Sequence, residues 1–289
     1  SVLPEVRGCS EEYARTKDVP GLPDGIPIAG MAGDQQAALF GQTCFQIGDA
    51  KCTYGTGAFL LVNTGNEPVA SEHGVLTTIG WQIGEETVYA LEGASFIAGA
   101  AVQWLRDELG LIQSAAESEA LASKVDSAGD VVFVPALTGL GAPHWDPHAR
   151  GLIYGLGRDT TAAHLARATL EGIAYQIADL AKAMEADVGR GLRRLRVDGG
   201  AAENDLMMQF QADLLDVEVD RPASVETTAL GAAYLAGLAV GVFSDLDAVV
   251  RSHHIDRTFT PRMDAEQREA SFSRWHAAVR RARSEPEPT

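Results

Sequence analysis

Hydrophobic residues recur along the chain with two periods, one helical and one extended. The clearest helical pattern spans residues 162–187, where apolar side chains at Ala166, Leu170, Ile173 and Ile177 recur every three or four positions. Similar spacing predicts helices at 35–42, 94–109, 204–215, 227–241 and 265–283. Runs of strand-forming residues predict strands at 52–54, 58–63, 74–82, 87–91, 131–134, 194–197 and 217–219, and a short one within 28–34.

Two regions lack either period. Residues 1–28 are polar and rich in proline and glycine, which break any regular element. Residues 138–160 hold 5 glycines and 2 prolines, which predicts a long loop. Elsewhere strands precede and then alternate with helices, an order that predicts an α/β protein with a mixed β-sheet flanked by helices. Small residues dominate 227–241, so we expect that helix to pack closely against a neighbour.

Composition narrows the functional class. The chain has 289 residues, 46% of them hydrophobic, and a formal net charge of −17 from 23 Lys+Arg and 40 Asp+Glu. An acidic surface argues against nucleic-acid and anionic-membrane partners. We find neither a transmembrane stretch nor a signal peptide. Cys9, Cys44 and Cys52 form no paired motif, which favours a reducing, cytoplasmic setting over a disulfide framework. The chain opens on Ser1, and we expect it to be a piece of a longer protein.

Glycine-rich turns are the first candidates for chemistry. They lie at 54–57, 93–99 and 198–201, and the last follows a predicted strand and precedes a predicted helix. Glycines let backbone N–H groups approach a phosphate, although each turn taken alone is more often an ordinary β-turn. The chain contains neither a G-x-x-x-x-G-K-[ST] motif nor a complete G-x-G-x-x-G between strand and helix, so no P-loop or Rossmann site is indicated.

Single polar residues give weaker signals. Asp34, at the end of a short apolar strand, could accept a proton from a substrate hydroxyl or cap the helix that follows. His144, Asp146 and His148 have metal-ligand character, but Pro143 and Pro147 favour a rigid turn there. We therefore predict no metal ligands in this chain.

Long phrases in a fixed order identify a family. They are GDQQAALFGQ at 33–42, TYGTGAFLLVNTG at 53–65, YALEGASFIAGAAVQWLRDELGL at 89–111, VPALTGLGAPHWDPHARGLIYGL at 134–156, LRVDGGA at 195–201 and ALGAAYLAGLAVG at 229–241. Together they resemble the carboxyl-terminal part of the glycerol kinases within the FGGY carbohydrate kinase family, over essentially the whole chain. The resemblance implies an actin/ribonuclease H-like ATPase fold. It also implies that residues 1–42 end an amino-terminal kinase domain, and that 43–289 form the carboxyl-terminal domain with the nucleotide site.

The resemblance also implies roles for individual residues. Asp34 matches the general base and, with Gln35, a glycerol contact. The residues that match nucleotide contacts are Thr56 in the phosphate turn, Gly99 and Gln103 at a helix start, and Gly200 and Asn204 at the adenosine site. ATP or ADP with Mg²⁺ would be the cofactors.

The implied function is ATP-dependent phosphorylation of glycerol to sn-glycerol 3-phosphate in the cytoplasm, by a homodimer or homotetramer. The amino-terminal half of such an enzyme is missing here, so we expect the chain to be inactive alone. Two alternatives remain open: another FGGY kinase for a polyol or ketose, and a non-catalytic actin-like nucleotide switch.

A regulatory feature of the family is absent from this sequence. In some bacterial members, fructose 1,6-bisphosphate inhibits through a loop with Gly and Arg shortly before GDQQ. Residues 19–25 here carry Asp24 and neither Arg nor Lys, and a bisphosphate needs cationic donors. We expect such inhibition to be weak or absent.

Overall fold

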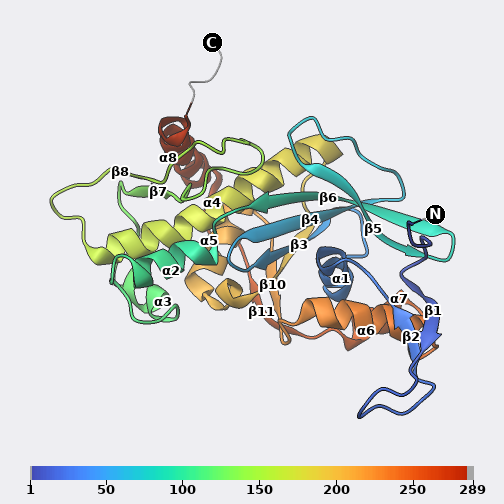
Figure 1. Ribbon diagram of the computed structural model, residues 1–289. Coiled ribbons are helices and arrows are strands. Elements are labelled where there is room, and N and C mark those ends of the chain that lie inside the picture. The colour runs from blue at the N-terminus through green and yellow to red at the C-terminus, as the bar shows by residue number, and fades with distance from the viewer. Residues whose placement is uncertain (1, 285–289) are drawn as a thin grey trace.

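The structure is a computed structural model that describes residues 2–284 (Figure 1). Within these residues its centre is a seven-stranded mixed sheet of strand order β11-β10-β9-β3-β4-β6-β5. Its strands are β3 (Asp49–Tyr54), β4 (Ala58–Gly65), β5 (Leu76–Ile83), β6 (Glu86–Ser95), β9 (Arg194–Asp198), β10 (Val219–Pro222) and β11 (Ile255–Phe259). β3, β9 and β10 run parallel, and the other neighbouring pairs are antiparallel.

Helices cover both faces of this sheet. One face carries α2 (Gly99–Asp107), α3 (Glu117–Ala122), α4 (Ala162–Val188), α5 (Asp205–Leu215) and α8 (Ala265–Ala282), and the other carries α1 (Asp34–Gly41), α6 (Thr227–Ala239) and α7 (Leu246–Ser252). Two hairpin-like pairs lie outside it, β1 (Ser10–Arg15) with β2 (Pro27–Gly30) and β7 (Val132–Val134) with β8 (Leu152–Tyr154). The expected mixed sheet flanked by helices is therefore confirmed.

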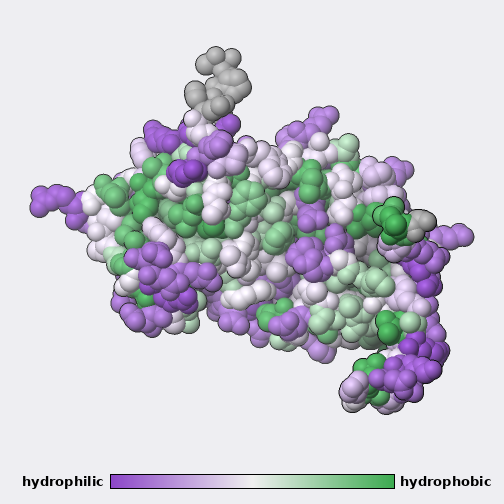
Figure 2. Space-filling model, viewed as in Figure 1, coloured by the Kyte–Doolittle hydropathy of each residue, from purple (hydrophilic) through white to green (hydrophobic). Residues whose placement is uncertain are grey.

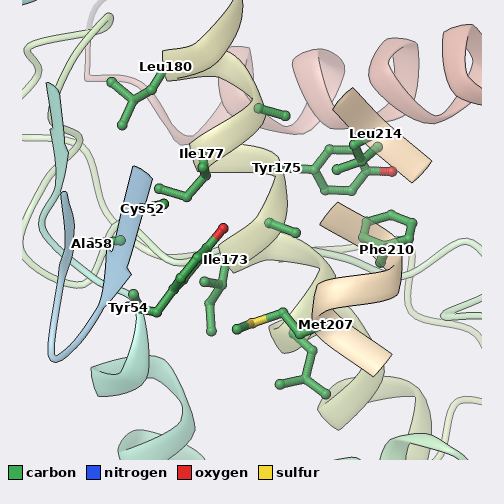
Figure 3. Packing of buried hydrophobic residues seen from close by; sticks show 14 of the residues in the cluster. Cys52, Tyr54, Ala58, Ile173, Tyr175, Ile177, Leu180, Met207, Phe210 and Leu214 are labelled. Atoms are coloured by element: carbon green, nitrogen blue, oxygen red, sulfur yellow. The ribbon is translucent and has the colours of Figure 1, made fainter. Parts of the chain in front are cut away.

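Side-chain alternation along β4 divides the core between the two helical layers. Leu60 and Val62 belong to the cluster under α4, whereas Leu61 belongs to the cluster under α1 and α6. α4 is buried along most of its length and contacts neighbours on two sides. Figure 3 shows Ile177 pointing toward Cys52 on β3, while Tyr175 points away toward Phe210 on α5. The rings of Tyr175 and Phe210 meet edge to face, with centroids 5.3 Å apart.

The predictions from the sequence located most of these helices and strands but missed several. The prediction that residues 1–28 form no regular element is wrong, because β1 lies between the prolines and pairs with β2. The predicted loop at 138–160 contains β8. The helix predicted from residue 94 begins at Gly99, since Ala94 and Ser95 still belong to β6. α3, α7 and β11 were not predicted.

The face in Figure 2 mixes hydrophilic and hydrophobic residues, with hydrophilic ones gathered over α3 and over the β1–β2 pair. Among residues 2–284, no helix has the length and apolarity needed to cross a bilayer.

Close packing of α1 on α6 confirms the expectation for the small-residue helix. A Cβ added to Gly231 would lie 1.8 Å from the carbonyl oxygen of Ala37, and one added to Gly41 would lie 2.0 Å from that of Thr227. Only glycines allow the two backbones to approach this closely. The contact fixes α1, and with it Asp34 and Gln35, against the rest of the fold.

Gly231→Ala is therefore expected to lower the free energy of unfolding by about 3 kcal/mol, because the added methyl must push the helices apart. Chemical denaturation of the protein measures this. Ala233→Ser, at an exposed position of the same helix, serves as the control and should change stability by less than about 0.5 kcal/mol. Equal stability of the two variants would show that the close approach is not needed.

Candidate functional site

Two turns meet at one edge of the central sheet because β3 and β9 are parallel neighbours. Thr53 pairs with Asp198, so both strands end at the same level. The turn at residues 55–57 follows β3, and a 3₁₀ helix (Gly200–Glu203) follows β9. Loops that follow adjacent parallel strands form a crevice where ligands bind in α/β proteins.

Glycines let this edge pack tightly. Gly199 has a φ of 83°, and a Cβ there would lie 2.5 Å from the carbonyl oxygen of Tyr54. A Cβ on Gly99 would lie 2.6 Å from the carbonyl oxygen of Gly55. That same oxygen accepts a hydrogen bond from the Gly99 N–H at 2.9 Å, and the Thr56 oxygen accepts one from the Ala98 N–H at 2.8 Å. The turn therefore holds the start of α2 in place.

A cavity of about 400 Å³ opens between these turns, α2, α3 and α5. Its lining includes every residue that the family resemblance assigned to a nucleotide: Thr56, Gly99, Gln103, Gly200 and Asn204. These residues are up to 148 positions apart in the chain, and the fold brings them around one space. The volume lies in the range of small-molecule sites.

Asn204 has a structural role as well as a place in the cavity wall. It is the N-cap of α5, and its Oδ1 accepts a hydrogen bond from the Met207 N–H at 2.9 Å. Its Nδ2 donates to Ser118 Oγ on α3 at 3.4 Å. By contrast, a Cβ added to Gly200 would meet no atom within 4 Å, so this residue faces open space.

Part of the cavity wall was not predicted. Val102, Leu170 and Met207 supply apolar surface, and Figure 3 shows Met207 beside Ile173 beneath this edge of the sheet. Further lining residues come from the segment before α3 and its first turn: Ala115, Ala116, Ser118 and Glu119. That segment carries no turn motif and no long apolar period, so the sequence offered no signal for it.

Asp34 and Gln35 lie apart from this cavity lining, at the start of α1. Gly33 is the N-cap residue of α1, so Asp34 is not the cap that one interpretation of the sequence suggested. The exposed carboxylate of Asp34 accepts from the Gln35 backbone N–H at 2.8 Å and from Gln35 Nε2 at 3.3 Å. A carboxylate is favoured at a helix N-terminus by the dipole.

A buried lysine lies behind this pair. Lys51 on β3 donates from Nζ to Gln35 Oε1 and, at 3.0 Å, to Thr53 Oγ1. Burial lowers the pKa of Lys51, and the nearby Asp198 carboxylate opposes that shift. The Asp34–Gln35 pair is thus connected to the strand that leads into the cavity.

The His144–His148 segment forms a turn closed by its own aspartate. Asp146 accepts hydrogen bonds from the backbone N–H groups of His148 at 3.0 Å, Ala149 at 2.9 Å and Ser284 at 2.7 Å. The Ser284 N–H and these others lower the pKa of Asp146 to about 2, against the effect of desolvation. His144 faces Asp179 on α4 instead, with Nε2 and Oδ2 3.5 Å apart. Residues 2–284 contain no cluster of three His, Cys, Asp or Glu arranged to hold a metal ion.

Comparison with known proteins shows which family the chain belongs to. The model of the FGGY family of carbohydrate kinases, C-terminal domain, matches residues 50–240. A glycerol kinase of Myxococcus xanthus is 59% identical over 282 residues, which cover 97% of this chain and 57% of the relative. One from Parabacteroides distasonis is 53% identical over 284 residues, 98% of this chain and 57% of the relative. The chain thus spans just over half the length of these relatives.

Solved structures of kinases also resemble this chain over just over half of their own length. A Plasmodium falciparum glycerol kinase with ADP superposes with a TM-score of 0.92 at 40% identity, covering 97% of this chain and 56% of that one. A ligand-bound xylulose kinase from Lactobacillus acidophilus superposes with a TM-score of 0.80 at 20% identity, covering 94% and 56%, which indicates a shared fold.

Proposed function

Because the chain belongs to the FGGY family of carbohydrate kinases, we propose that it is the carboxyl-terminal part of an enzyme that phosphorylates glycerol with ATP. It has the actin/ribonuclease H-like ATPase fold expected from the sequence, a mixed sheet between two helical layers. The observation that carries the proposal is the convergence of Thr56, Gly99, Gln103, Gly200 and Asn204 on one cavity. Identity of 59% to a glycerol kinase over nearly the whole chain supports glycerol as the acceptor.

In this proposal the cavity holds ATP or ADP. Its apolar wall at Val102, Leu170 and Met207 receives the base, and the open space at Gly200 admits the nucleoside. The Thr56 hydroxyl, exposed at the tip of the turn after β3, donates to phosphate oxygens. Phosphoryl transfer depends mainly on such positioning and on charge neutralisation.

Asp34 is the proposed general base. It takes the proton of the glycerol 3-hydroxyl as that oxygen forms a bond to the γ-phosphorus, and the bond from that phosphorus to ADP breaks. The products are sn-glycerol 3-phosphate and ADP. Gln35 lies beside the carboxylate and is a further proposed glycerol contact.

Mg²⁺ would enter this site as a companion of the nucleotide. The described residues offer no cluster of three acidic or histidine ligands, and Mg²⁺ in kinases is held largely by substrate phosphates with one or two carboxylates. When bound, it neutralises phosphate charge. The phosphates would carry the ion.

The remaining parts of the proposal concern the whole protein. Residues 1–42 would end the amino-terminal domain and residues 43–289 would form the carboxyl-terminal domain, with the other cleft wall on the missing half. The intact enzyme would act in the cytoplasm as a homodimer or homotetramer. Cys44 and Cys52, buried free thiols, fit a reducing compartment.

The test is a coupled assay of ADP release by the full-length protein with glycerol, erythritol or xylulose as acceptor. We expect ADP release to depend on glycerol and kcat/KM to be at least about tenfold higher for glycerol than for the other two. A preference for erythritol or xylulose would assign the protein to another branch of the family. ADP release unaffected by any acceptor would favour a nucleotide switch.

A further inference from the structure

Lys51 is a charged side chain with no exposed surface, set in the middle of the central sheet. Burying an ammonium group is costly unless it is hydrogen-bonded. Its ammonium group donates hydrogen bonds to Gln35 Oε1 on α1 and Thr53 Oγ1 on β3, both uncharged. Two carboxylates, of Asp198 and Glu92, act on Lys51 through space. An apolar residue at this position would make neither of these two hydrogen bonds.

The lysine fixes which way the Gln35 amide points. An ammonium group can only donate hydrogen bonds, so it must face the carbonyl oxygen of the amide. The amide nitrogen then necessarily faces the other way, toward Asp34 Oδ2 at 3.3 Å. A reversed amide would turn its NH2 group toward the Lys51 ammonium, donor against donor, and its oxygen toward the Asp34 carboxylate, acceptor against acceptor. Lys51 therefore sets the orientation of the Gln35 amide, and the amide nitrogen in turn holds the Asp34 carboxylate.

The other side of Lys51 leads to the cavity. Thr53 holds Nζ at 3.0 Å and is followed directly by Tyr54, Gly55 and Thr56, which line the cavity wall. Thr53 also pairs with Asp198, the last residue of β9. Lys51 thus lies between the start of α1 and the turns that form the cavity.

We propose that Lys51 is a positioning residue that orients the Gln35 amide and through it the Asp34 carboxylate toward the polyol. This role rests on the proposed function, in which Asp34 and Gln35 hold glycerol. Lys51 does not touch glycerol itself. Its contribution should therefore disappear when Gln35 is removed, whereas a general structural contribution of the buried charge would persist.

The test is a double-mutant cycle in the full-length protein. Lys51→Met removes the donor at similar length, and Gln35→Ala removes the amide. Each single variant should raise the KM for glycerol about tenfold, the size expected for one hydrogen bond to a charged group. The double variant should match Gln35→Ala alone, because the two residues act in series. The KM for ATP should stay within about threefold of the unmodified protein in all three.

Two matched variants control the cycle. Thr53→Val removes the other partner of Nζ while leaving Gln35 in place, and should leave the KM for glycerol within about threefold. Lys51→Arg keeps a donor and should retain most of the glycerol affinity, whereas Lys51→Gln does not dictate the amide orientation and should lose it. This Arg–Gln pair decides the question if Lys51→Met does not fold.

The outcomes are separable. Effects of Lys51→Met and Gln35→Ala that add in the double variant, or equal KM values for Lys51→Arg and Lys51→Gln, would overturn the positioning role while leaving the proposed function standing. An unmodified full-length protein that does not phosphorylate glycerol would overturn the proposed function and this role together.

Discussion

Asp34→Asn in the full-length protein is expected to lower kcat for glycerol phosphorylation by about 10³-fold, within the range lost with a general base. The amide cannot take the proton of the attacking hydroxyl. Folding should be unaffected, because Asp34 is exposed and its bond from the Gln35 N–H can be accepted equally by an amide oxygen. Steady-state rates with glycerol and ATP measure the effect, and the KM for ATP should be unchanged.

Asp247→Asn is the matched control, since Asp247 is also an exposed acid in the first turn of a helix, α7. It should leave kcat within about twofold. An Asp34→Asn enzyme that keeps more than about a third of the unmodified rate would remove Asp34 from the role of base.

Gly200→Val is expected to raise the KM for ATP roughly 10- to 100-fold with little loss of stability. A Cβ added at Gly200 meets no protein atom within 4 Å, and Gly200 lines the cavity that the nucleoside would need. The steric conflict arises only when nucleotide binds, and overpacking of this kind costs about 1–3 kcal/mol. KM values for ATP and melting temperatures of the full-length protein measure the two parts of the prediction.

Gly191→Val is the control for the conformational effect of replacing a glycine by valine outside the cavity. Gly191 is exposed, its nearest non-neighbouring atom to an added Cβ is a Glu185 oxygen at 3.5 Å, and it lies outside the cavity lining. The KM for ATP should be unchanged there. If Gly200→Val bound ATP as well as the control variant does, the cavity would not be the nucleoside site.

Comparing the sequence-based predictions with the structure shows which parts of the site a sequence can predict. The turns at 54–57 and 198–201 were found because local chemistry, glycine after a strand, creates them. Their meeting follows from the parallel pairing of β3 and β9, which no local pattern specifies. The wall at residues 115–119 depends on a helix of six residues, α3, too short to show a period.

The strands that were missed are formed by tertiary pairing. β1 and β11 lie at sheet edges and are half-exposed or exposed along most of their length, so neither shows a clear alternation. α2 was predicted five residues too early because Ala94 and Ala98 extend its apolar helical spacing, whereas residues 94 and 95 pair with β4 as the end of β6.

Lys51 is the clearest example of a residue whose surroundings cannot be predicted from the sequence. It stands one residue before a predicted strand, and a lysine at a strand boundary is ordinarily exposed. Its burial results from α1 packing over that face of the sheet, which places Gln35 within reach of its ammonium group. The hydrogen bonds of Asp34 and Gln35 could likewise be seen only in the structure, although the family resemblance implied the roles of both residues.

Calorimetric titration of the 289-residue chain with MgADP tests the central claim most directly. The account predicts saturable binding at a single site, weakened at least about tenfold by Gly200→Val and unchanged by Gly191→Val. A chain that shows a cooperative unfolding transition yet binds no ADP, or binds it equally in both variants, would contradict the assignment of this cavity.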